Sequence, residues 1–492
     1  MTISSGRPPS PVSVARGAVL VVAMRWTDRL IGIASTLILA RLLMPADFGI
    51  VAMASLVVAL IDTLLDMGVN SALIQNPKAD RDDFDTAWTL RLGQALLAAL
   101  LIAILGAPLA AEYFNDARVE DVLRFMALTV VLGGIENIGI VYFQKNMEFG
   151  RDFRFFFLRR LAGFVITIAL AFWLRSYWAM VIGALAGRLV GVWLSYALHD
   201  FRPRLSLARI KQMWGFSQWI LVRNLGAYGT QQLDKILVGR RTDAATLGAY
   251  SLADDIAAMP TGELLAPLGR VLFPAFVQAA HDPAELRRTY CLALGVQAIV
   301  ALPAGVGLAL VADTAVPLLL GVQWQVAIPL VQTLALLNVA LAMMHSSGYL
   351  LLTLGKVRLL AIFSWLQLGM LASLTLLAFP QAGAEGIANI RLAVSILAML
   401  AFLGMVLHVV PGLSWRHVLA HVWRPAFATG GMAAALIFIT VSPDWAPGLR
   451  LVVDVLVGGA VYSALLLLFW FAQKMPWGAE RYLLEKLRSI RS

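Results

Sequence analysis

The stretch ILARLLMPADFGIVA, at residues 38–52, joins two apolar segments through a short turn. A similar stretch, ILVGRRTDAATLGAYSLA, occurs at residues 236–253, and each copy has a glycine shortly after the turn. These glycines, Gly49 and Gly248, are 199 positions apart. Six apolar segments separate the copies, so both copies have the same orientation. The repeat therefore predicts two parallel six-helix lobes, an arrangement found in transporters.

Apolar residues dominate the whole chain. Of its 492 residues, 60% are hydrophobic and only 14% are charged, whereas soluble proteins have about a quarter charged residues. The mean hydropathy is +0.79. Apolar runs of roughly 20 residues recur from end to end, each long enough to cross a bilayer core of about 30 Å. The composition predicts an all-α polytopic membrane protein, because a β-barrel would show short alternating strands.

The apolar runs predict fourteen transmembrane helices joined by short connections. We place them at 12–41, 46–74, 83–110, 120–143, 155–174, 177–198, 213–239, 245–277, 289–312, 325–354, 358–379, 384–410, 422–442 and 449–473. The first six form an N-terminal lobe, the next six a C-terminal lobe, and two helices are appended with a cytoplasmic tail. The corresponding ranges are 1–200, 205–410 and 411–492.

The distribution of basic residues predicts the topology. With both termini in the cytoplasm, most Lys and Arg of the connections lie on the cytoplasmic side, as the positive-inside rule requires. Arg159 and Arg160 are counted with these cytoplasmic residues. The basic N-terminus lacks a signal-peptide cleavage site, so the first span is expected to be retained. The net charge of +10 therefore reflects topology, and no nucleic-acid partner is expected.

Charged residues also occur inside the predicted spans, where each costs about 2.5–3.5 kcal/mol at a helix centre on insertion scales. Arg25, Asp28 and Arg29 fall on one face of the first span. The seventh span carries Arg223 at the matching place of the repeat, 198 positions after Arg25. Beside Arg223 runs a polar stripe of Asn224, Tyr228, Gln231 and Lys235.

These residues predict a cationic cleft, because Arg offers phosphate a fork of donors and Lys a point charge. The predicted cleft consists of Arg25, Asp28, Arg29, Arg91, Arg188, Arg223, Asn224, Tyr228, Gln231, Lys235, Arg270 and Arg391. The alternative is that Asp28 pairs with Arg25 or Arg29 and only locks helices together. Arg124 lies near a span end and is expected to extend towards the membrane surface.

Acidic residues in the spans have two interpretations. Coupling to H⁺ or Na⁺ would use a carboxylate with a shifted pKa, and the alternative that we favour is neutralisation of neighbouring Arg. The candidates for coupling are Asp62, Asp66, Asp254, Asp255 and Glu263.

Prolines and glycines suggest mechanical roles. Pro260, Pro267 and Pro274 recur every seven residues in the eighth span and predict a hinge or a static bend. The pattern G-x-x-x-G-x-x-x-G, with Gly183, Gly187 and Gly191, predicts a close-packing helix face.

No catalytic or metal-binding motif is evident. The chain lacks a G-x-x-x-x-G-K-[ST] motif, its six His show no metal spacing, and Cys291 is its single cysteine. The acidic run at 80–85 precedes a span and predicts a helix cap. We therefore expect no catalytic residues, no metal and no cofactor.

The stretches LLMPADFGIVAMASLVVALIDTLLDMGVNSALIQ, at 42–75, and QQLDKILVGRRTDAATLGAYSLADDIAAMPTGELLAPLGRVLFPAF, at 231–276, resemble a known family. They are similar to the polysaccharide-transporter (Wzx-like) flippases of the multidrug/oligosaccharidyl-lipid/polysaccharide exporter superfamily. The D-F-G, D-x-G-x-x-x-A-L-I-Q and L-G-x-Y-S patterns carry the resemblance.

This resemblance implies a function at the bacterial inner membrane. Members move undecaprenyl-pyrophosphate-linked oligosaccharide from the cytoplasmic to the periplasmic leaflet by alternating access, for exopolysaccharide, capsule or O-antigen synthesis. A polysaccharide polymerase and a chain-length regulator become candidate partners beside the lipid bilayer. Alternatives are a cation-coupled multidrug exporter or a lipid II flippase of the same superfamily, and, from another class, a membrane glycosyltransferase or polymerase.

Overall fold

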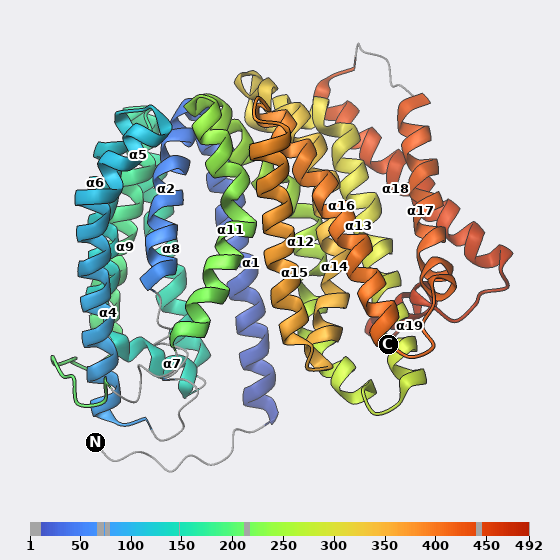
Figure 1. Cartoon of the computed structure of the whole chain (residues 1–492), viewed down its shortest axis with the longest axis horizontal. Coiled ribbons are helices and arrows are strands. Elements are labelled where there is room, and N and C mark those ends of the chain that lie inside the picture. Colours follow the sequence, from blue (N-terminus) through green and yellow to red (C-terminus); the bar gives the residue numbers. More distant parts are fainter. Residues whose placement is uncertain are drawn as a thin grey trace. The chain divides into compact units, whose positions relative to one another are not determined.

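The computed structural model describes residues 11–65, 73, 79–146, 148–210, 217–438 and 445–491, and every regular element in these ranges is a helix (Figure 1). The first half contains α1 (Pro11–Leu42), α2 (Pro45–Leu65), α4 (Arg81–Leu101), α5 (Ala107–Phe114), α6 (Arg118–Ile135), α7 (Val141–Lys145), α8 (Phe149–Leu174) and α9 (Trp178–Leu198). The second half contains α11 (Ser217–Arg241), α12 (Ala244–Ala279), α13 (Pro283–Leu320), α14 (Ile328–Thr353), α15 (Val357–Ser373), α16 (Ala384–Val409), α17 (Trp415–Phe438), α18 (Pro447–Ala472) and α19 (Ala479–Arg491).

Short irregular turns interrupt some helices. The π-helical turns η1 (Ile102–Gly106) and η4 (Leu374–Ala378) continue α4 and α15, and the 3₁₀ turns η2 (Ile138–Ile140) and η3 (Val322–Ala327) precede α7 and α14. Such turns are common where a helix must adjust its register.

The membrane-spanning character of these helices follows from their length and composition. Within the described ranges, nine helices are long and apolar enough to cross a membrane, or ten if α6 and the segment Ile138–Lys145, bent by 60°, form one span. The prediction of an all-α polytopic membrane protein is confirmed. A helix lies in each of the fourteen predicted ranges, but the number of spans stays a prediction.

The chain divides into two compact units. Unit 1 comprises Met1–Tyr228 and Asp243–Gly248, and unit 2 comprises Gly229–Thr242 and Ala249–Ser492. The division into 1–200, 205–410 and 411–492 stays a prediction.

In unit 1, the two copies of the repeated turn pack directly against each other. A Cβ atom added to Gly49 would lie 1.7 Å from the carbonyl oxygen of Ala244, and one added to Gly248 would lie 1.9 Å from that of Pro45. The contact is reciprocal, since Gly49 and Gly248 occupy equivalent places in the repeat, as do Pro45 and Ala244. The first turns of α2 and α12 can approach this closely only because both glycines lack a side chain.

The carboxylate of Asp47 fixes the same turn from the other side. It accepts hydrogen bonds from the backbone N–H groups of Met44, at 2.9 Å, and of Tyr177, at 2.9 Å. The start of α2 is thereby tied to the segment that precedes α9.

Helices α8 and α9 also pack closely. A Cβ atom on Gly183 would lie 1.9 Å from Oγ1 of Thr167, and one on Gly187 would lie 3.2 Å from Cα of Gly163. This confirms the close-packing face predicted from the glycine pattern. Helix α8 contacts α1 on another side, and α6 contacts α2, α4 and α9.

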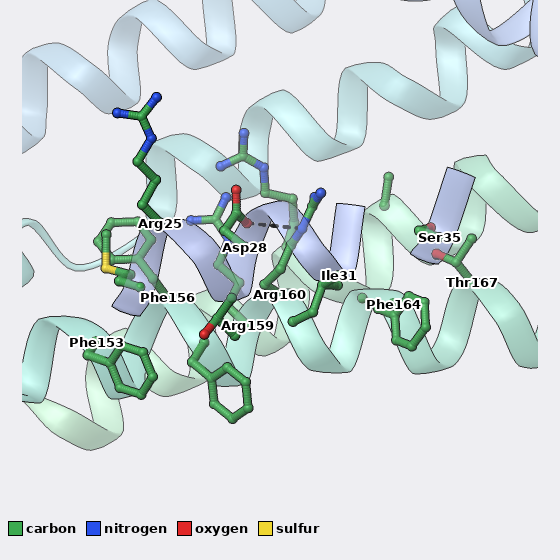
Figure 2. Close-up of a pocket in the computed structure, with 18 of the residues that line it drawn as sticks. Arg25, Asp28, Ile31, Ser35, Phe153, Phe156, Arg159, Arg160, Phe164 and Thr167 are labelled. Atoms are coloured by element: carbon green, nitrogen blue, oxygen red, sulfur yellow. Dashed lines mark ion pairs between the residues drawn. The ribbon is translucent and has the colours of Figure 1, made fainter. Parts of the chain in front are cut away.

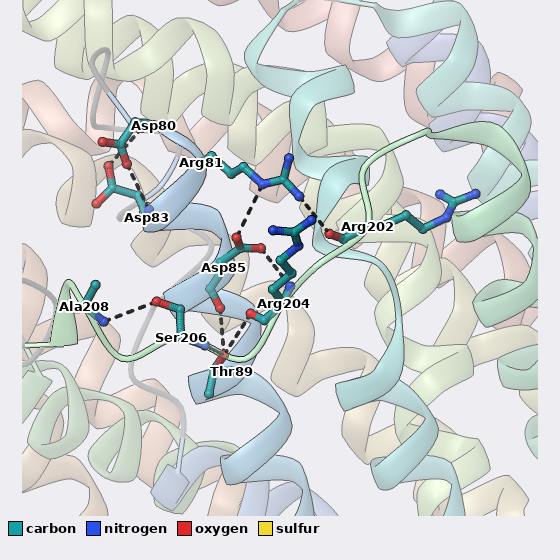
Figure 3. A network of polar contacts seen from close by, with 9 residues as sticks. All are labelled: Asp80, Arg81, Asp83, Asp85, Thr89, Arg202, Arg204, Ser206 and Ala208. Atoms are coloured by element: carbon teal, nitrogen blue, oxygen red, sulfur yellow. Dashed lines mark hydrogen bonds and ion pairs between the residues drawn. The ribbon is translucent and has the colours of Figure 1, made fainter. Parts of the chain in front are cut away.

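The segment after α9 lies along the start of α4 (Figure 3). The backbone N–H groups of Arg204 and Ser206 donate to Asp85, at 2.9 Å, and to Thr89, at 2.9 Å. Asp80 caps α4 through a reciprocal capping box with Asp83, which confirms the predicted cap. The backbone N–H of Asp83 lowers the pKa of the Asp80 carboxyl.

Unit 2 is built around α13, which contacts α14, α17 and α18, while α14 contacts α16. The hydroxyl groups of Tyr290 and Ser347 form a buried hydrogen bond of 2.9 Å between α13 and α14. A buried ion pair of 3.1 Å between Arg424 and Glu480 holds α19 against α17.

We expect Gly49→Ala and Gly248→Ala each to lower the thermal unfolding midpoint of the purified protein. Each added methyl group meets a backbone carbonyl, and such overpacking costs about 1–3 kcal/mol. The two effects should be less than additive, since both substitutions disturb one contact.

Gly93→Ala is the matched control, because a Cβ atom there has no neighbour within 4 Å. Its midpoint should be unchanged or higher, since Ala favours a helix over Gly. Equal midpoints for all three variants would contradict the close contact between the repeated turns.

Candidate functional site

A cavity of about 650 Å³ lies between α1, α8 and α9 in unit 1 (Figure 2). Its charged lining residues are Arg25, Asp28, Arg159, Arg160 and Arg188. Aromatic side chains of α8 complete the wall, namely Phe153, Phe156, Phe157 and Phe164. We call this space the α1–α8–α9 cavity.

The α1–α8–α9 cavity has more cations than its lining carboxylate can neutralise. Asp28 accepts an ion pair from Nε of Arg160 at 3.1 Å. The guanidinium of Arg25 is directed away from this pair (Figure 2), and within the described residues it has no ion pair. Asp28 therefore pairs with Arg160 of α8, and not with Arg25 as the alternative interpretation proposes. The cavity can bind an anion through guanidinium groups.

A second cavity, of about 250 Å³, lies between α2, α4, α6 and α9. Asp62, Arg91, Gln94, Thr129 and Arg188 are its polar lining residues. Arg188 therefore lines both cavities of unit 1. We call the smaller space the α4–α6 pocket.

Glu136 is the buried carboxylate between the two cavities, and only 3% of its side chain is exposed. It lies 3.2 Å from Arg159 and 3.9 Å from Arg91. Arg188 is close enough to Arg91 and Arg159 for like charges to repel. Two guanidinium groups thus share one carboxylate, and a third, that of Arg188, lies near them.

The basic residues of unit 2 are arranged differently. The guanidinium of Arg391 lies 2.6 Å from Asp234 and 3.2 Å from Asp254, and the ammonium of Lys235 lies 2.9 Å from Asp254. Tyr250 donates a hydrogen bond of 2.7 Å to Asp234. Two cations and two carboxylates balance, so this network of α11, α12 and α16 is neutral.

The remaining predicted cleft residues are spread along α1, α11 and α12. The hydroxyl of Tyr228 donates to the backbone oxygen of Leu56 at 2.7 Å, Asn224 is half-buried, and Gln231 is exposed. Arg29 on α1 is half-buried and does not line either cavity. The side chains of Arg223 and Arg270 lie outside the described residues. The predicted roles of all these residues stay predictions.

The candidates for ion coupling and for the hinge are also dispersed. Asp62 lines the α4–α6 pocket, Asp254 belongs to the unit 2 network, and Asp66 lies outside the described residues. On α12, Asp255 is exposed and Glu263 is half-buried. Across the described residues, no group of three or more His, Cys, Asp or Glu could hold a metal ion.

Helix α12 continues without a break from Ala244 to Ala279 and includes all three prolines. Pro260 is half-buried and Pro274 is exposed, whereas the side chain of Pro267 lies outside the described residues. The hinge stays a prediction.

Two cavity residues, Arg159 and Arg160, were not among the predicted site residues. Because both residues lie near the start of a predicted span, they are expected in a cytoplasmic connection. The structure instead places both well inside α8. The sequence did contain a signal for their position, because the predicted span 155–174 includes both residues. Glu136 is an acidic residue of a predicted span that is not among the predicted site residues, and its burial between two arginines depends on the packing of α4, α6 and α8.

Comparisons with known proteins agree with this architecture. The solved structure of the lipid II flippase MurJ in an inward closed conformation aligns with a TM-score of 0.71 at 12% identity, over 92% of this chain and 99% of that chain. This similarity concerns the fold alone.

Sequence comparisons define the family. A family model described as "Polysaccharide biosynthesis protein" matches residues 38–329, more than half of the chain. The lipopolysaccharide biosynthesis protein WzxC of Escherichia coli (strain K12) is 25% identical over 405 residues, which are 81% of each chain. The succinoglycan biosynthesis transport protein ExoT of Rhizobium meliloti (strain 1021) is 28% identical over 301 residues, 61% of each chain.

The spanning helices and the charged cavities identify the chain as a polytopic membrane protein with a transporter architecture. Within that class, the chain belongs to the polysaccharide biosynthesis protein family whose model it matches.

We expect Arg391→Gln to destabilise the protein strongly. The change leaves the fully buried Asp234 without its cation, and breaking a buried pair costs about 3–5 kcal/mol. The double variant Arg391→Gln/Asp234→Asn should recover part of the loss. The measurement is the thermal unfolding midpoint.

Arg124→Gln is the control, because Arg124 pairs with Glu120 at an exposed position, where ion pairs contribute about 0–1 kcal/mol. Midpoints that fall equally in Arg391→Gln and Arg124→Gln would show that the unit 2 network contributes no more than a surface pair.

Proposed function

We propose that the protein is a flippase that moves undecaprenyl-pyrophosphate-linked oligosaccharide from the cytoplasmic to the periplasmic leaflet. The observation that carries this proposal is the excess of guanidinium groups in the α1–α8–α9 cavity. Membership of the polysaccharide biosynthesis protein family supports it, and so does the similarity to ExoT, a succinoglycan biosynthesis transport protein.

The lining of the cavity suits a pyrophosphate group. Four arginines and one carboxylate line it, and Arg160 and Arg159 are paired with Asp28 and Glu136. This leaves two guanidinium groups for the two negative charges of a pyrophosphate that joins a lipid to a sugar. Guanidinium groups bind phosphate oxygens through paired, charge-assisted hydrogen bonds. Phenylalanine rings from α8 offer apolar surface beside these donors, where the first sugar or the first isoprene unit can lie.

The cost of these arginines supports a role in binding. A charged residue in the middle of a spanning helix costs about 2.5–3.5 kcal/mol on insertion scales, and such residues commonly mark a substrate pathway. In unit 2 the comparable cost is offset by ion pairs. In the α1–α8–α9 cavity Arg25 is exposed and has no such pair within the described chain, so its guanidinium is accessible to an anionic substrate.

Transport would proceed by alternating access, with the substrate exposed first to the cytoplasm and then to the periplasm. Coupling to H⁺ or Na⁺ through acidic residues of the spans is part of this proposal. Asp254 is the least suitable carboxylate for it, because Lys235 and Arg391 already neutralise its charge. Asp62, Asp255 and Glu263 are the other candidates within the described chain.

The proposed location is the bacterial inner membrane, with both termini in the cytoplasm. A polysaccharide polymerase and a chain-length regulator would act on the product at the periplasmic side. A multidrug exporter would carry neutral or cationic compounds, which the basic cavity would not favour. A lipid II flippase shares the pyrophosphate chemistry, so only the glycan separates it from the proposed function.

The proposal is tested with the purified full-length protein in liposomes that contain an undecaprenyl-pyrophosphate-linked oligosaccharide. The double variant Arg25→Gln/Arg160→Gln should lower the initial rate of transfer between leaflets at least about tenfold. Each substitution removes charge-assisted hydrogen bonds worth about 1.5–3 kcal/mol.

Arg154→Gln is the matched control, because Arg154 is an exposed residue of the same helix, α8, and does not line the cavity. Its transfer rate should equal that of the unchanged protein. Full transfer by the double variant would contradict the proposed role of the cavity.

A further inference from the structure

The α4–α6 pocket differs chemically from the larger cavity. Aromatic residues are absent from its described lining, and its polar side chains come from all four surrounding helices. Arg188 lines both the pocket and the α1–α8–α9 cavity, so the two spaces are neighbours.

Donors and acceptors are both present in the pocket. Arg91 and Arg188 can only donate hydrogen bonds, and Arg188 has no hydrogen bond or ion pair within the described chain. The amide NH₂ of Gln94 donates to the backbone oxygen of Leu65 at 2.5 Å, so the amide oxygen remains available as an acceptor. Thr129 donates to the backbone oxygen of Met126 at 2.6 Å, and its oxygen can still accept.

The charge of the pocket favours a monoanion. Its lining contains the cations Arg91 and Arg188 and the carboxylate of Asp62, which leaves one positive charge. The neighbouring pair of Arg159 and Glu136, 3.2 Å apart, adds no net charge.

A phosphate group fits this arrangement poorly. Phosphate esters present chiefly acceptor oxygens, so the acceptors of Gln94, Thr129 and Asp62 would find no donors on them. A polyhydroxylated carboxylic acid offers both kinds of group. Its carboxylate can accept from the two guanidinium groups, while its hydroxyl groups donate to the three acceptors.

We infer that the α4–α6 pocket is a subsite for an acidic sugar, a monosaccharide unit of uronic-acid type in the glycan that the protein carries. The carboxylate lies between Arg91 and Arg188, and the hydroxyl groups face Gln94, Thr129 and Asp62. This inference rests on the proposed function, and it assigns the pyrophosphate to the α1–α8–α9 cavity and the acidic sugar to the pocket.

The test measures protection against thermal unfolding of the full chain in lipid nanodiscs, at constant ionic strength. The probes are sodium glucuronate, glucose, sodium acetate and sodium pyrophosphate. Glucuronate should raise the midpoint, because a ligand of the folded state stabilises it, whereas glucose and acetate at equal concentration should not. Arg91→Gln should weaken the affinity for glucuronate at least about tenfold, and Thr129→Val about threefold, as expected for one neutral hydrogen bond.

Thr353→Val is the matched control, because Thr353 also donates within its helix, to Tyr349 at 2.9 Å, but does not line the pocket. It should bind glucuronate like the unchanged protein, and both Thr129→Val and Thr353→Val should keep their protection by pyrophosphate. Equal protection by glucose and glucuronate, or equal affinity in Thr129→Val and Thr353→Val, overturns the subsite.

Pyrophosphate separates this inference from the proposed function. Protection by pyrophosphate without protection by glucuronate would overturn the subsite and leave the pyrophosphate site standing. Protection by glucuronate alone would support the subsite and contradict the assignment of pyrophosphate to the larger cavity.

Discussion

The first turns of α2 and α12 meet so closely that a single methyl group on either helix would collide with a carbonyl of the other. The two glycines that permit this contact, Gly49 and Gly248, occupy equivalent places in an internal repeat. Gly49 faces Ala244 and Gly248 faces Pro45, and these two residues are also equivalent in the repeat. A self-complementary contact of this kind is what two-fold related elements form. It holds the start of α2 against the start of α12, and α2 in turn contacts α4, α5 and α6 in unit 1.

Unbalanced charge distinguishes the interior of unit 1 from that of unit 2. In unit 2, Asp234 and Asp254 neutralise Arg391 and Lys235 at distances of 2.6–3.2 Å, so the network there is neutral. In unit 1, guanidinium groups of α1, α4, α8 and α9 surround two cavities with fewer carboxylates. The function proposed for the protein rests on this difference, because guanidinium groups that lack a neutralising carboxylate favour the binding of an anion.

The helical architecture could be predicted from the sequence because apolar length alone determines where a chain can cross a bilayer. Gly49 and Gly248 were recognised as a repeat, but their contact could not be predicted, since it depends on how segments 199 positions apart fold together. For the same reason the sequence suggested a partner for Asp28 within α1, whereas the structure pairs it with Arg160 of α8. Arg159 and Arg160 were assigned to a cytoplasmic connection because the positive-inside rule treats basic residues near a span end as topological signals.

The central claim is that the α1–α8–α9 cavity holds a pyrophosphate-linked glycan. Native mass spectrometry of the protein purified from cells that make the glycan tests it most directly. The account predicts one undecaprenyl-pyrophosphate-linked oligosaccharide per chain, lost when Arg25 and Arg160 are both replaced by Gln and retained when Arg154 is replaced. Equal retention of that lipid by the two variants, or a chain that carries only phospholipid, would contradict the account.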